Sequence, residues 1–228
     1  MRLHIGQSRL RGDLSRYARG FDLLELRAEP GRIPRPAGLR RWAEQAPAGF
    51  VFSVVLPRRV AALEPSAEQE RELESALRAA DALGATWLVA QTPASVTPTE
   101  RARRRLGELS ERLPRDGRRI AWEPQGLWED EESERLAERL GLHLVRDLSR
   151  SVAAPGDVAY TRVRTWGESA RLGAVRAQRV AERLVGHSEA FVVLETPGAA
   201  QGARALREAV AEWEHDGFDE DEIDEGEG

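Results

Sequence analysis

The feature that most constrains the fold is the regular alternation of short apolar runs with amphipathic helical segments. Eight runs of strand length are rich in Val, Leu, Ile and Phe, at 3–6, 22–27, 50–56, 86–91, 119–123, 142–145, 158–163 and 191–194. Nearly continuous apolar runs are typical of parallel strands that are buried on both faces. Between the runs, Ser66 and Thr97 each open a helix-capping pattern, and Gly84 and Gly141 each follow a helical stripe.

Eight strands that alternate with helices permit either a doubly wound open sheet or a closed (β/α)8 barrel. A doubly wound nucleotide-binding protein carries a glycine-rich turn after its first strand. Here Gly6 is followed by Gln-Ser-Arg-Leu, without further glycines. We therefore predict the α/β class, with a single (β/α)8 TIM-barrel-like domain over residues 1–213.

Composition excludes several kinds of site. The 228 residues contain no cysteine, so disulfides, thiolate metal sites and a cysteine nucleophile are absent. All 34 basic residues are arginine, which excludes a Schiff-base lysine and a lysine-bearing phosphate loop. No run approaches the ~18 apolar residues that a membrane helix needs, and the first residues do not open a signal peptide. We expect a cytoplasmic protein with no membrane partner.

Charge is distributed unevenly along the chain. Residues 215–228 carry eight acids and no arginine, whereas the preceding residues carry 31 acids and 34 arginines. Such a run buries too little apolar surface to order itself, so we predict a disordered acidic tail at 214–228. The basic run 101–105 is flanked by Glu100 and Glu108 and has no aromatic residues for base stacking. We do not expect a nucleic-acid partner.

Several motifs, in order over about residues 1–210, resemble the domain of unknown function 72 (YecE-like) family. They are Leu24-Glu25-Leu26, Ile33-Pro34, Arg41-Trp42-Ala43-Glu44, Pro47-Ala48-Gly49-Phe50-Val51-Phe52, Val89-Ala90-Gln91-Thr92-Pro93, Ile120-Ala121-Trp122-Glu123 with Trp128, Val145-Arg146-Asp147 and Tyr160-Thr161-Arg162. The resemblance implies a TIM-barrel-like fold with a pocket and no established reaction.

The chain also departs from that family's pattern. Residues 27–31 replace its Asn-Ser-Thr-Phe-Tyr, and 194–196 replace its Phe-Asn-Asn. Val55 stands for a lysine, Gln125 for an arginine and Arg164 for a histidine. Five polar pocket positions therefore differ in type, which identifies a divergent member.

In TIM barrels, catalytic and binding residues lie at the carboxyl ends of the strands and on the loops that follow. Because side chains alternate along a strand, Glu25 and Arg27 share one face, as do Tyr160, Arg162 and Arg164. Polar residues at these ends are Glu25, Arg27, Gln91, Glu123, Gln125, Asp147, Arg162, Arg164 and Glu195. If these faces point inward, carboxylates and guanidiniums meet at the barrel mouth. They form either a pocket or a closed ion-pair network with no substrate.

For the pocket, we predict that Arg162 and Arg164 clamp an anion, because two guanidiniums can fork onto phosphate or carboxylate. Glu123 is the candidate acid or base, with Asp147 and Glu25 orienting it. Further contacts to substrate are predicted for Tyr160, Gln91, Arg27, Gln125 and Trp128. Trp128 and Trp166 suit stacking on a planar or sugar ligand, or filling of the core.

Four functional readings are weighed. The leading one is a strand-end pocket for an anionic or polyhydroxylated small molecule, with hydrolysis as an open possibility. Glycoside hydrolysis needs two carboxyl groups ~5–5.5 Å or ~6.5–9.5 Å apart, a distance that sequence does not give. A hard-metal site would use Glu25, Glu123, Asp147 and Glu195, but we expect no metal and no cofactor. The alternative is a non-catalytic barrel that has lost the family's pocket chemistry and acts as a scaffold.

Overall fold

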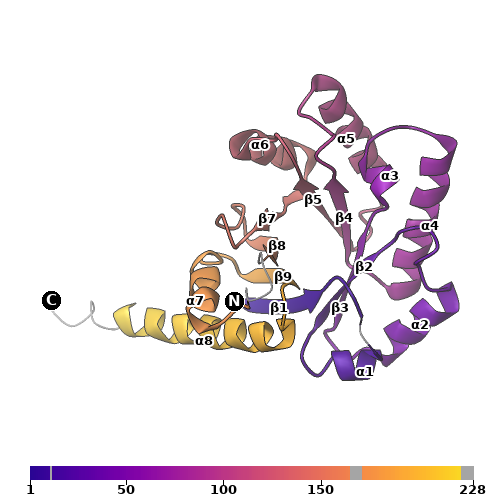
Figure 1. The fold of residues 1–228 in the computed structure, drawn as a ribbon. Helices are drawn as coiled ribbons and strands as arrows, with labels where there is room; N and C mark the ends of the chain where they lie inside the picture. The colour runs from indigo at the N-terminus through magenta and orange to yellow at the C-terminus, as the bar shows by residue number, and fades with distance from the viewer. Residues whose placement is uncertain (11, 165–170, 222–228) are drawn as a thin grey trace.

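Parallel strands form a ring, and the helices lie on its outside (Figure 1). The computed structural model describes residues 1–10, 12–164 and 171–221, except the side chains of 214 and 216–221. The strands are β1 (Arg2–Gln7), β2 (Leu23–Arg27), β3 (Val51–Val55), β4 (Trp87–Thr92), β5 (Arg119–Pro124), β6 (His143–Leu144), β7 (Arg146–Asp147), β8 (Val158–Arg164) and β9 (Glu189–Glu195). Their order around the sheet is β6-β5-β4-β3-β2-β1-β9-β8-β7, and every pair is parallel.

The helices follow the strands along the chain. They are α1 (Leu14–Tyr17), α2 (Pro36–Gln45), α3 (Arg58–Ala61), α4 (Ala67–Leu83), α5 (Glu100–Arg112), α6 (Asp130–Leu140), α7 (Ala174–Glu182) and α8 (Ala199–Asp221). Three of the predicted caps are present: the Ser66 hydroxyl accepts from the Gln69 amide at 3.1 Å, and Gly84 and Gly141 end α4 and α6 with φ of 59° and 61°. The cap predicted at Thr97 lies two residues later, because the Thr99 hydroxyl accepts from the Ala102 amide at 3.2 Å and α5 begins at Glu100.

The ring closes through a single run of chain. β6 pairs with β5 and β7 pairs with β8, so residues 143–147 occupy one strand position and bridge the two neighbours. The Val145 amide donates to the Trp122 carbonyl at 2.8 Å, and the Leu148 amide donates to the Arg162 carbonyl at 2.7 Å. The eight predicted strand runs therefore form one barrel, and the (β/α)8 prediction is confirmed.

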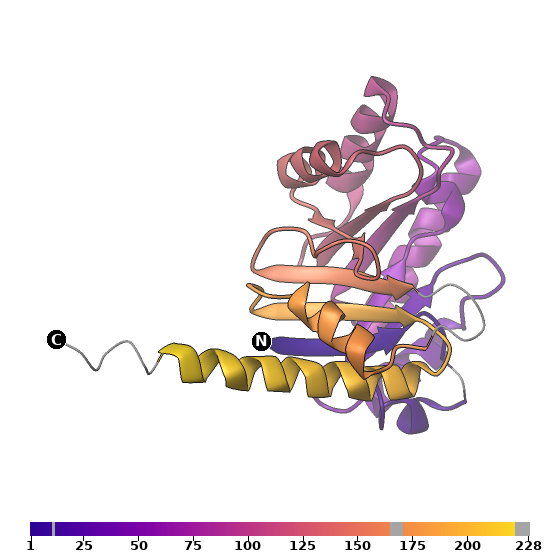
Figure 2. The same cartoon turned by 60° about the vertical axis from the view of Figure 1, so that its left-hand side comes forward.

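The alternation of strand and helix fails at one crossover. Residues 148–157, between β7 and β8, form turns and loop instead of a helix, as Figure 2 shows beside α6. The segment is ten residues long and contains Pro155-Gly156, which disfavours helix. Its backbone is held to the end of α7, because the Ala153 amide donates to the Arg183 carbonyl at 3.0 Å and Arg183 Nη1 donates to the Leu148 carbonyl.

The interior of the ring contains an apolar layer, and a polar layer lies beyond it toward the carboxyl ends of the strands. Trp87 packs against Tyr160 and Phe191, with ring centroids 4.8 and 5.0 Å apart. This layer is completed by Leu23, Val55, Val89, Ala121, Val145 and Val193. A second, larger apolar cluster fills the space between the strands and the helices. Inward-facing side chains that come two residues after this layer along a strand therefore lie nearer the carboxyl ends of the strands.

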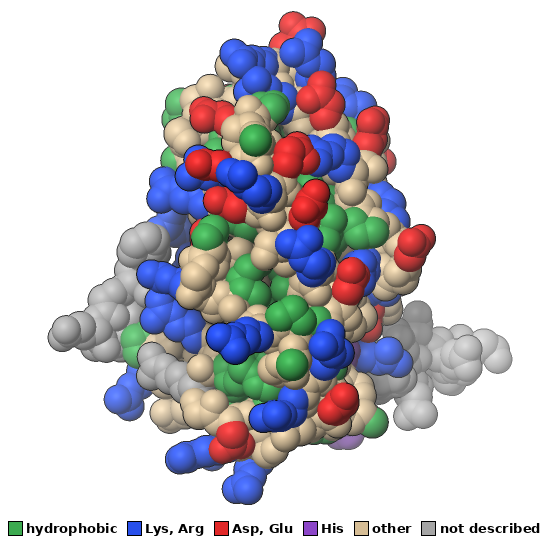
Figure 3. Space-filling view, turned by 90° about the vertical axis from the view of Figure 1, so that its right-hand side faces the viewer, with side chains coloured by type: hydrophobic (Ala, Val, Ile, Leu, Met, Phe, Trp, Pro, Cys, Tyr) green, Lys and Arg blue, Asp and Glu red, His purple; other side chains and the backbone are tan. Residues whose placement is uncertain are grey.

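The outer surface mixes charges of both signs. On the flank of α2 and α4, which Figure 3 presents, arginine and acidic side chains are interspersed. Pairs one turn apart on the helices include Arg78 with Glu74 on α4 and Arg104 with Glu108 on α5, each at 3.6 Å. Such a surface is typical of a solvated protein face.

The last helix is longer than the sequence suggested. α8 continues past residue 213 to Asp221, and residues 222–228 lie outside the described ranges. Leu206 and Val210 lie on the buried face of this helix, whereas Trp213 is 44% exposed. The disordered acidic tail stays a prediction. Within the described ranges, no helix has both the length and the apolar character needed to span a bilayer.

Gly6 marks the closest approach of β1 and β2. A Cβ atom at Gly6 would lie 1.9 Å from the carbonyl oxygen of Leu23, its partner in the ladder. We predict that Gly6→Ala lowers the free energy of unfolding by about 2–3 kcal/mol, because the backbone must shift to admit the methyl group. Urea denaturation measures this change. Gly20→Ala is the control, since nothing lies within 4 Å of its added Cβ; equal losses in both variants would contradict the prediction.

Candidate functional site

Arg162 lies at the centre of the site and is fully buried. It extends from β8, where the inward position is two residues beyond Tyr160. Its Nη1 and Nη2 donate to the two carboxylate oxygens of Glu25 at 2.9 and 2.8 Å, a bidentate pair. Its Nε donates to Glu123 Oε2 at 2.5 Å, and Nη1 also reaches Glu195 Oε1 at 3.3 Å. One guanidinium thus joins carboxylates from β2, β5 and β9.

A second layer of polar groups lies above Arg162. Arg164 donates to Glu123 Oε1 at 2.5 Å and to Glu195 Oε2 at 2.8 Å. Arg27 donates to Gln91 Oε1 at 2.9 Å and to Glu195 Oε1 at 3.0 Å. Gln91 in turn donates to Glu123 Oε2 at 3.0 Å. Side chains of β2, β4, β5, β8 and β9 therefore form one continuous hydrogen-bonded network.

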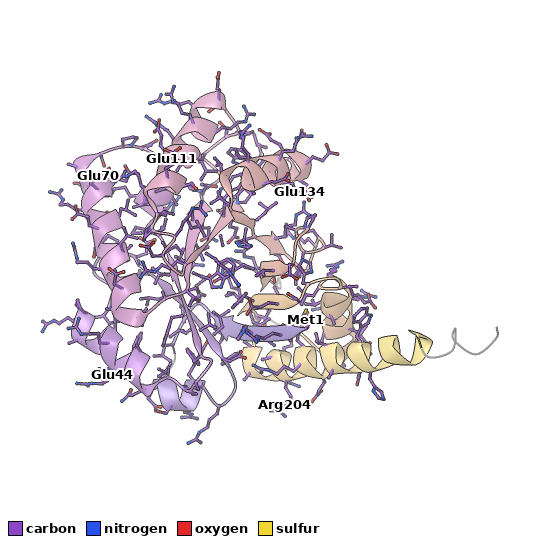
Figure 4. The ribbon with its side chains drawn as sticks, turned by 180° about the vertical axis from the view of Figure 1, so that it is seen from behind. Met1, Glu44, Glu70, Glu111, Glu134 and Arg204 are labelled. Carbon is purple, nitrogen blue, oxygen red and sulfur yellow. The ribbon has the colours of Figure 1, made fainter. Side chains whose placement is uncertain are left out.

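Tyr160 and Ser53 form the base of this network. The Tyr160 hydroxyl donates to Glu25 Oε2 at 2.8 Å and lies 2.8 Å from the Ser53 hydroxyl. Both residues are fully buried. Ser53 was not predicted as a site residue; its signal in the sequence was a polar residue within the apolar run 50–56. The structure pairs it with Glu25 in the ladder between β2 and β3. Seen from behind (Figure 4), side chains fill the interior of the ring, while the labelled Glu134 extends from α6 on the outside.

The network is electrically balanced. Its three guanidiniums, on Arg27, Arg162 and Arg164, meet the three carboxylates of Glu25, Glu123 and Glu195. Exposure rises toward the rim: the side chains of Arg164 and Glu195 are 24% and 21% exposed, and that of Arg27 is 38% exposed. Fully buried charges are stable only when they are paired. The three guanidiniums and three carboxylates of the network neutralise one another, so no ligand is needed to balance their charge.

The pairing fixes the protonation states. Burial raises the pKa of the Glu123 carboxyl, but Arg162 and Arg164 together outweigh burial and hold that pKa below its ordinary value. Burial, followed by the nearby charge of Glu25, raises the pKa of the Tyr160 hydroxyl well above its ordinary value. Glu123 is therefore ionised at neutral pH and Tyr160 keeps its proton. This argues against Glu123 as a general acid, one of the two roles, acid or base, that the sequence suggested for it.

Other predicted residues lie outside the network. Asp147 accepts hydrogen bonds from the Ser149 amide at 2.9 Å and the Arg164 amide at 3.2 Å, so it organises backbone rather than Glu123. Gln125 is exposed on the loop after β5. Trp128 is buried, and its Nε1 donates to the Val96 carbonyl at 2.8 Å. The second aromatic candidate, Trp166, lies outside the described residues.

Trp128 packs edge-on against Trp122, with ring centroids 5.1 Å apart. It therefore fills the layer between strands and helices instead of presenting a face to the mouth. In the described ranges, no group of three or more His, Asp or Glu side chains is arranged to hold a metal ion. Of the four carboxylates that a hard-metal site would need, those of Glu25, Glu123 and Glu195 are bound to guanidiniums. The fourth, that of Asp147, accepts from backbone amides.

The family model for the "Protein of unknown function DUF72" matches residues 6–222. The chain belongs to the DUF72 family. The resemblance seen in the sequence motifs is thereby confirmed, and the departures at the pocket positions make this a divergent DUF72 member. No curated protein matches the chain.

Solved structures agree with this assignment. A DUF72 family protein from Enterococcus faecalis V583 superposes with a TM-score of 0.73 at 13% identity, covering 92% of this chain and 95% of that one. A DUF72 family protein from Thermotoga maritima MSB8 gives 0.66 at 19% identity, covering 94% and 100%. An L-ribulose 3-epimerase gives 0.61 at 14% identity, covering 93% and 96%. At these identities the similarity establishes the shared barrel fold alone.

Removing the central guanidinium should be costly. We predict that Arg162→Met lowers the free energy of unfolding by about 3–5 kcal/mol, because Glu25 and Glu123 are left buried without their partner. Arg112→Met is the matched control, since Arg112 pairs with Glu70 on the surface, and we expect it to cost less than about 1 kcal/mol. Urea denaturation of both variants measures the difference. Similar losses would mean that the buried pair is worth no more than a surface pair.

The protonation state of Glu123 gives a second test. A carboxyl whose pKa is lower in the folded state stabilises the fold above its unfolded pKa, and that contribution is lost as pH falls through the folded pKa. We predict that the carboxyl carbon of Glu123 titrates with a midpoint below 4.5 in NMR spectra of glutamate-labelled protein, assigned with Glu123→Gln. A midpoint above 4.5 would mean that burial dominates, and Glu123 would again be a candidate acid.

Proposed function

We propose that the barrel mouth binds a small polyhydroxylated molecule through the rim of the network, at Arg27, Gln91, Arg164 and Glu195. The single observation that carries this proposal is the presence of charged donors and charged acceptors side by side at a partly exposed rim. Arg27 and Arg164 supply N–H donors, and Glu195 between them supplies carboxylate oxygens.

Charge balance favours a polyhydroxylated ligand over an anion at this position. Each hydroxyl group both donates and accepts a hydrogen bond, so it can contact a guanidinium and a carboxylate together. An anion would have to compete with Glu195 for the same guanidiniums, and it would meet that carboxylate at close range. The anion clamp expected of Arg162 and Arg164 is accordingly not part of the proposal for the mouth, since Arg162 is fully buried and bound to Glu25 and Glu123.

The proposal is for binding without hydrolysis. A glycoside hydrolase needs one carboxyl group that still holds its proton near the working pH. The lowered pKa of Glu123 argues against that role. The nearest alternative, a barrel that has lost its pocket chemistry and serves as a scaffold, is supported by the same closed pairing and is separated from binding by the experiment below.

The neighbours among solved structures are consistent with a ligand of this class. An L-ribulose 3-epimerase and a D-tagatose 3-epimerase-like protein share the barrel, with TM-scores of 0.61 and 0.62. Both proteins are named for a sugar, ribulose in one case and tagatose in the other. This supports a choice of sugars and polyols as the first ligands to test.

We predict that at least one free sugar or polyol raises the melting temperature of the wild-type chain. A ligand present at 100-fold excess over its Kd stabilises a fold by about 2.7 kcal/mol, a shift of several degrees for a chain of this length. In the variant Arg27→Gln/Glu195→Gln, which removes one charge of each sign, we expect the affinity for that ligand to fall at least about tenfold, because two charge-assisted hydrogen bonds are lost. Isothermal titration measures this affinity.

The matched control is Arg135→Gln/Glu131→Gln, which removes an exposed pair of opposite charges on α6. It should leave the affinity within about twofold. If no sugar or polyol shifts the melting temperature of the wild-type chain, the binding proposal fails and the scaffold alternative is favoured.

A further inference from the structure

A cavity lies on the outside of the ring, beside the strand that carries Arg162. It has a volume of about 400 Å3 and occupies the region where the crossover between β7 and β8 forms no helix. Its walls come from the start of that crossover, from the end of β8 and from α7, which Figure 2 shows crossing in front of the sheet. The lining residues are Leu148, Ser149, Arg150, Val163, Arg164, Leu172, Arg176, Arg179, Val180 and Arg183.

The charges around this cavity have one sign. Among the described lining residues, five of ten are arginine and none is acidic, in a chain whose net charge is −5. This is the opposite of the mouth, where three guanidiniums meet three carboxylates. One of the five lining arginines, Arg164, is paired with Glu123 and Glu195 in the network of the mouth. A cavity with a local excess of positive charge attracts anions at short range even when the whole molecule is negative.

Helix α7 provides a continuous basic stripe along the cavity. Arg176, Arg179 and Arg183 are spaced by three and four residues, so they lie on one face, and like charges at this spacing destabilise a helix. Elsewhere the chain relieves such charge with acids one turn away, as Arg135 pairs with Glu131 on α6. In α7 no residue of the stripe forms an ion pair among the described residues.

The stripe arginines leave much of their donor capacity unused. Arg183 Nη1 donates to the Leu148 carbonyl, and Arg176 Nη1 makes a long contact of 3.4 Å with the Arg171 carbonyl. Arg179 is exposed and has no hydrogen-bond partner among the described residues. Each guanidinium carries five N–H donors, so several of them are available to a ligand.

The remaining walls are apolar. Leu148, Val163, Leu172 and Val180 are all buried and form the side of the cavity that faces the core. A site of this volume that combines apolar walls with a few charged donors is typical of small-molecule binding. The apolar walls favour a ligand with an organic body over a bare inorganic ion.

We propose that this cavity binds the phosphate ester of a small organic molecule, with the phosphate group on Arg176, Arg179 and Arg183 and the organic body against the apolar walls. A phosphate group offers three terminal oxygens and close to two negative charges, so it can accept from several guanidiniums at once, whereas a carboxylate offers two oxygens and one charge. The proposal is independent of sugar binding at the mouth; Arg164 is the one residue that lines both places.

The test is isothermal titration with phenyl phosphate at constant ionic strength. We expect sub-millimolar binding to the wild-type chain, with inorganic phosphate weaker by about tenfold because it lacks the apolar body. Benzoate, which keeps the ring but carries a carboxylate, should also be weaker by about tenfold. Arg176→Gln/Arg179→Gln should weaken phenyl phosphate binding at least about tenfold. The matched control Arg135→Gln/Arg139→Gln, which removes the same charge from α6, should change it less than about twofold.

Each other outcome overturns the proposal. If phenyl phosphate does not bind to the wild-type chain up to about 10 mM, the cavity is not a phosphate-ester site. Equal losses in the two arginine double variants would indicate general charge attraction, and equal affinity for benzoate would refute the preference for phosphate. Loss in Arg27→Gln/Glu195→Gln with full binding in Arg176→Gln/Arg179→Gln would place the ligand at the mouth. This last pair of variants also keeps failure here distinct from failure of sugar binding.

Discussion

The structure depends above all on the pairing of one buried guanidinium with carboxylates from three other strands. Arg162 carries its charge into the interior of the ring, where desolvation would be prohibitive without partners of opposite sign. Glu25 binds it in a bidentate arrangement, and Glu123 and Glu195 complete its contacts. These partners come from strands on both sides of β8, so the pairing is satisfied only when the sheet has closed with the right register. Closure and charge neutralisation therefore require one another.

The same pairing limits the chemistry that the mouth can perform. A carboxylate held by two arginines has a lowered pKa, and it is a weaker base and a poorer proton donor at neutral pH than an isolated buried acid. The groups best placed to meet a solute are the partly exposed ones at the rim, where the guanidiniums of Arg27 and Arg164 lie beside the carboxylate of Glu195. Recognition of hydroxyl groups follows from this arrangement more readily than proton transfer does.

Strand periodicity was sufficient to predict which residues share a face, and insufficient to predict what they contact. Glu25 with Arg27, and Tyr160 with Arg162 and Arg164, point inward because side chains alternate along a strand. Their partners depend on the register between strands distant in sequence, which the sequence does not express. Asp147 has the same inward register, yet its carboxylate is satisfied by two backbone amides nearby. Trp128 was predicted to stack on a ligand because it follows the end of a strand. In the structure it is buried against Trp122.

The missing helix after β7 explains why the two candidate sites differ in charge. At the mouth, residues from five strands converge, and each guanidinium finds a carboxylate across the ring. α8 packs against α7, but the face of α7 that lines the cavity meets the short loop after β7. None of the described lining residues on that loop is acidic. The positive charges of Arg176, Arg179 and Arg183 therefore line a partly apolar cavity without a carboxylate partner among the described residues. A charge pattern of this kind costs stability in the empty protein, and binding a multiply charged anion would remove that cost while leaving the balanced network of the mouth unchanged.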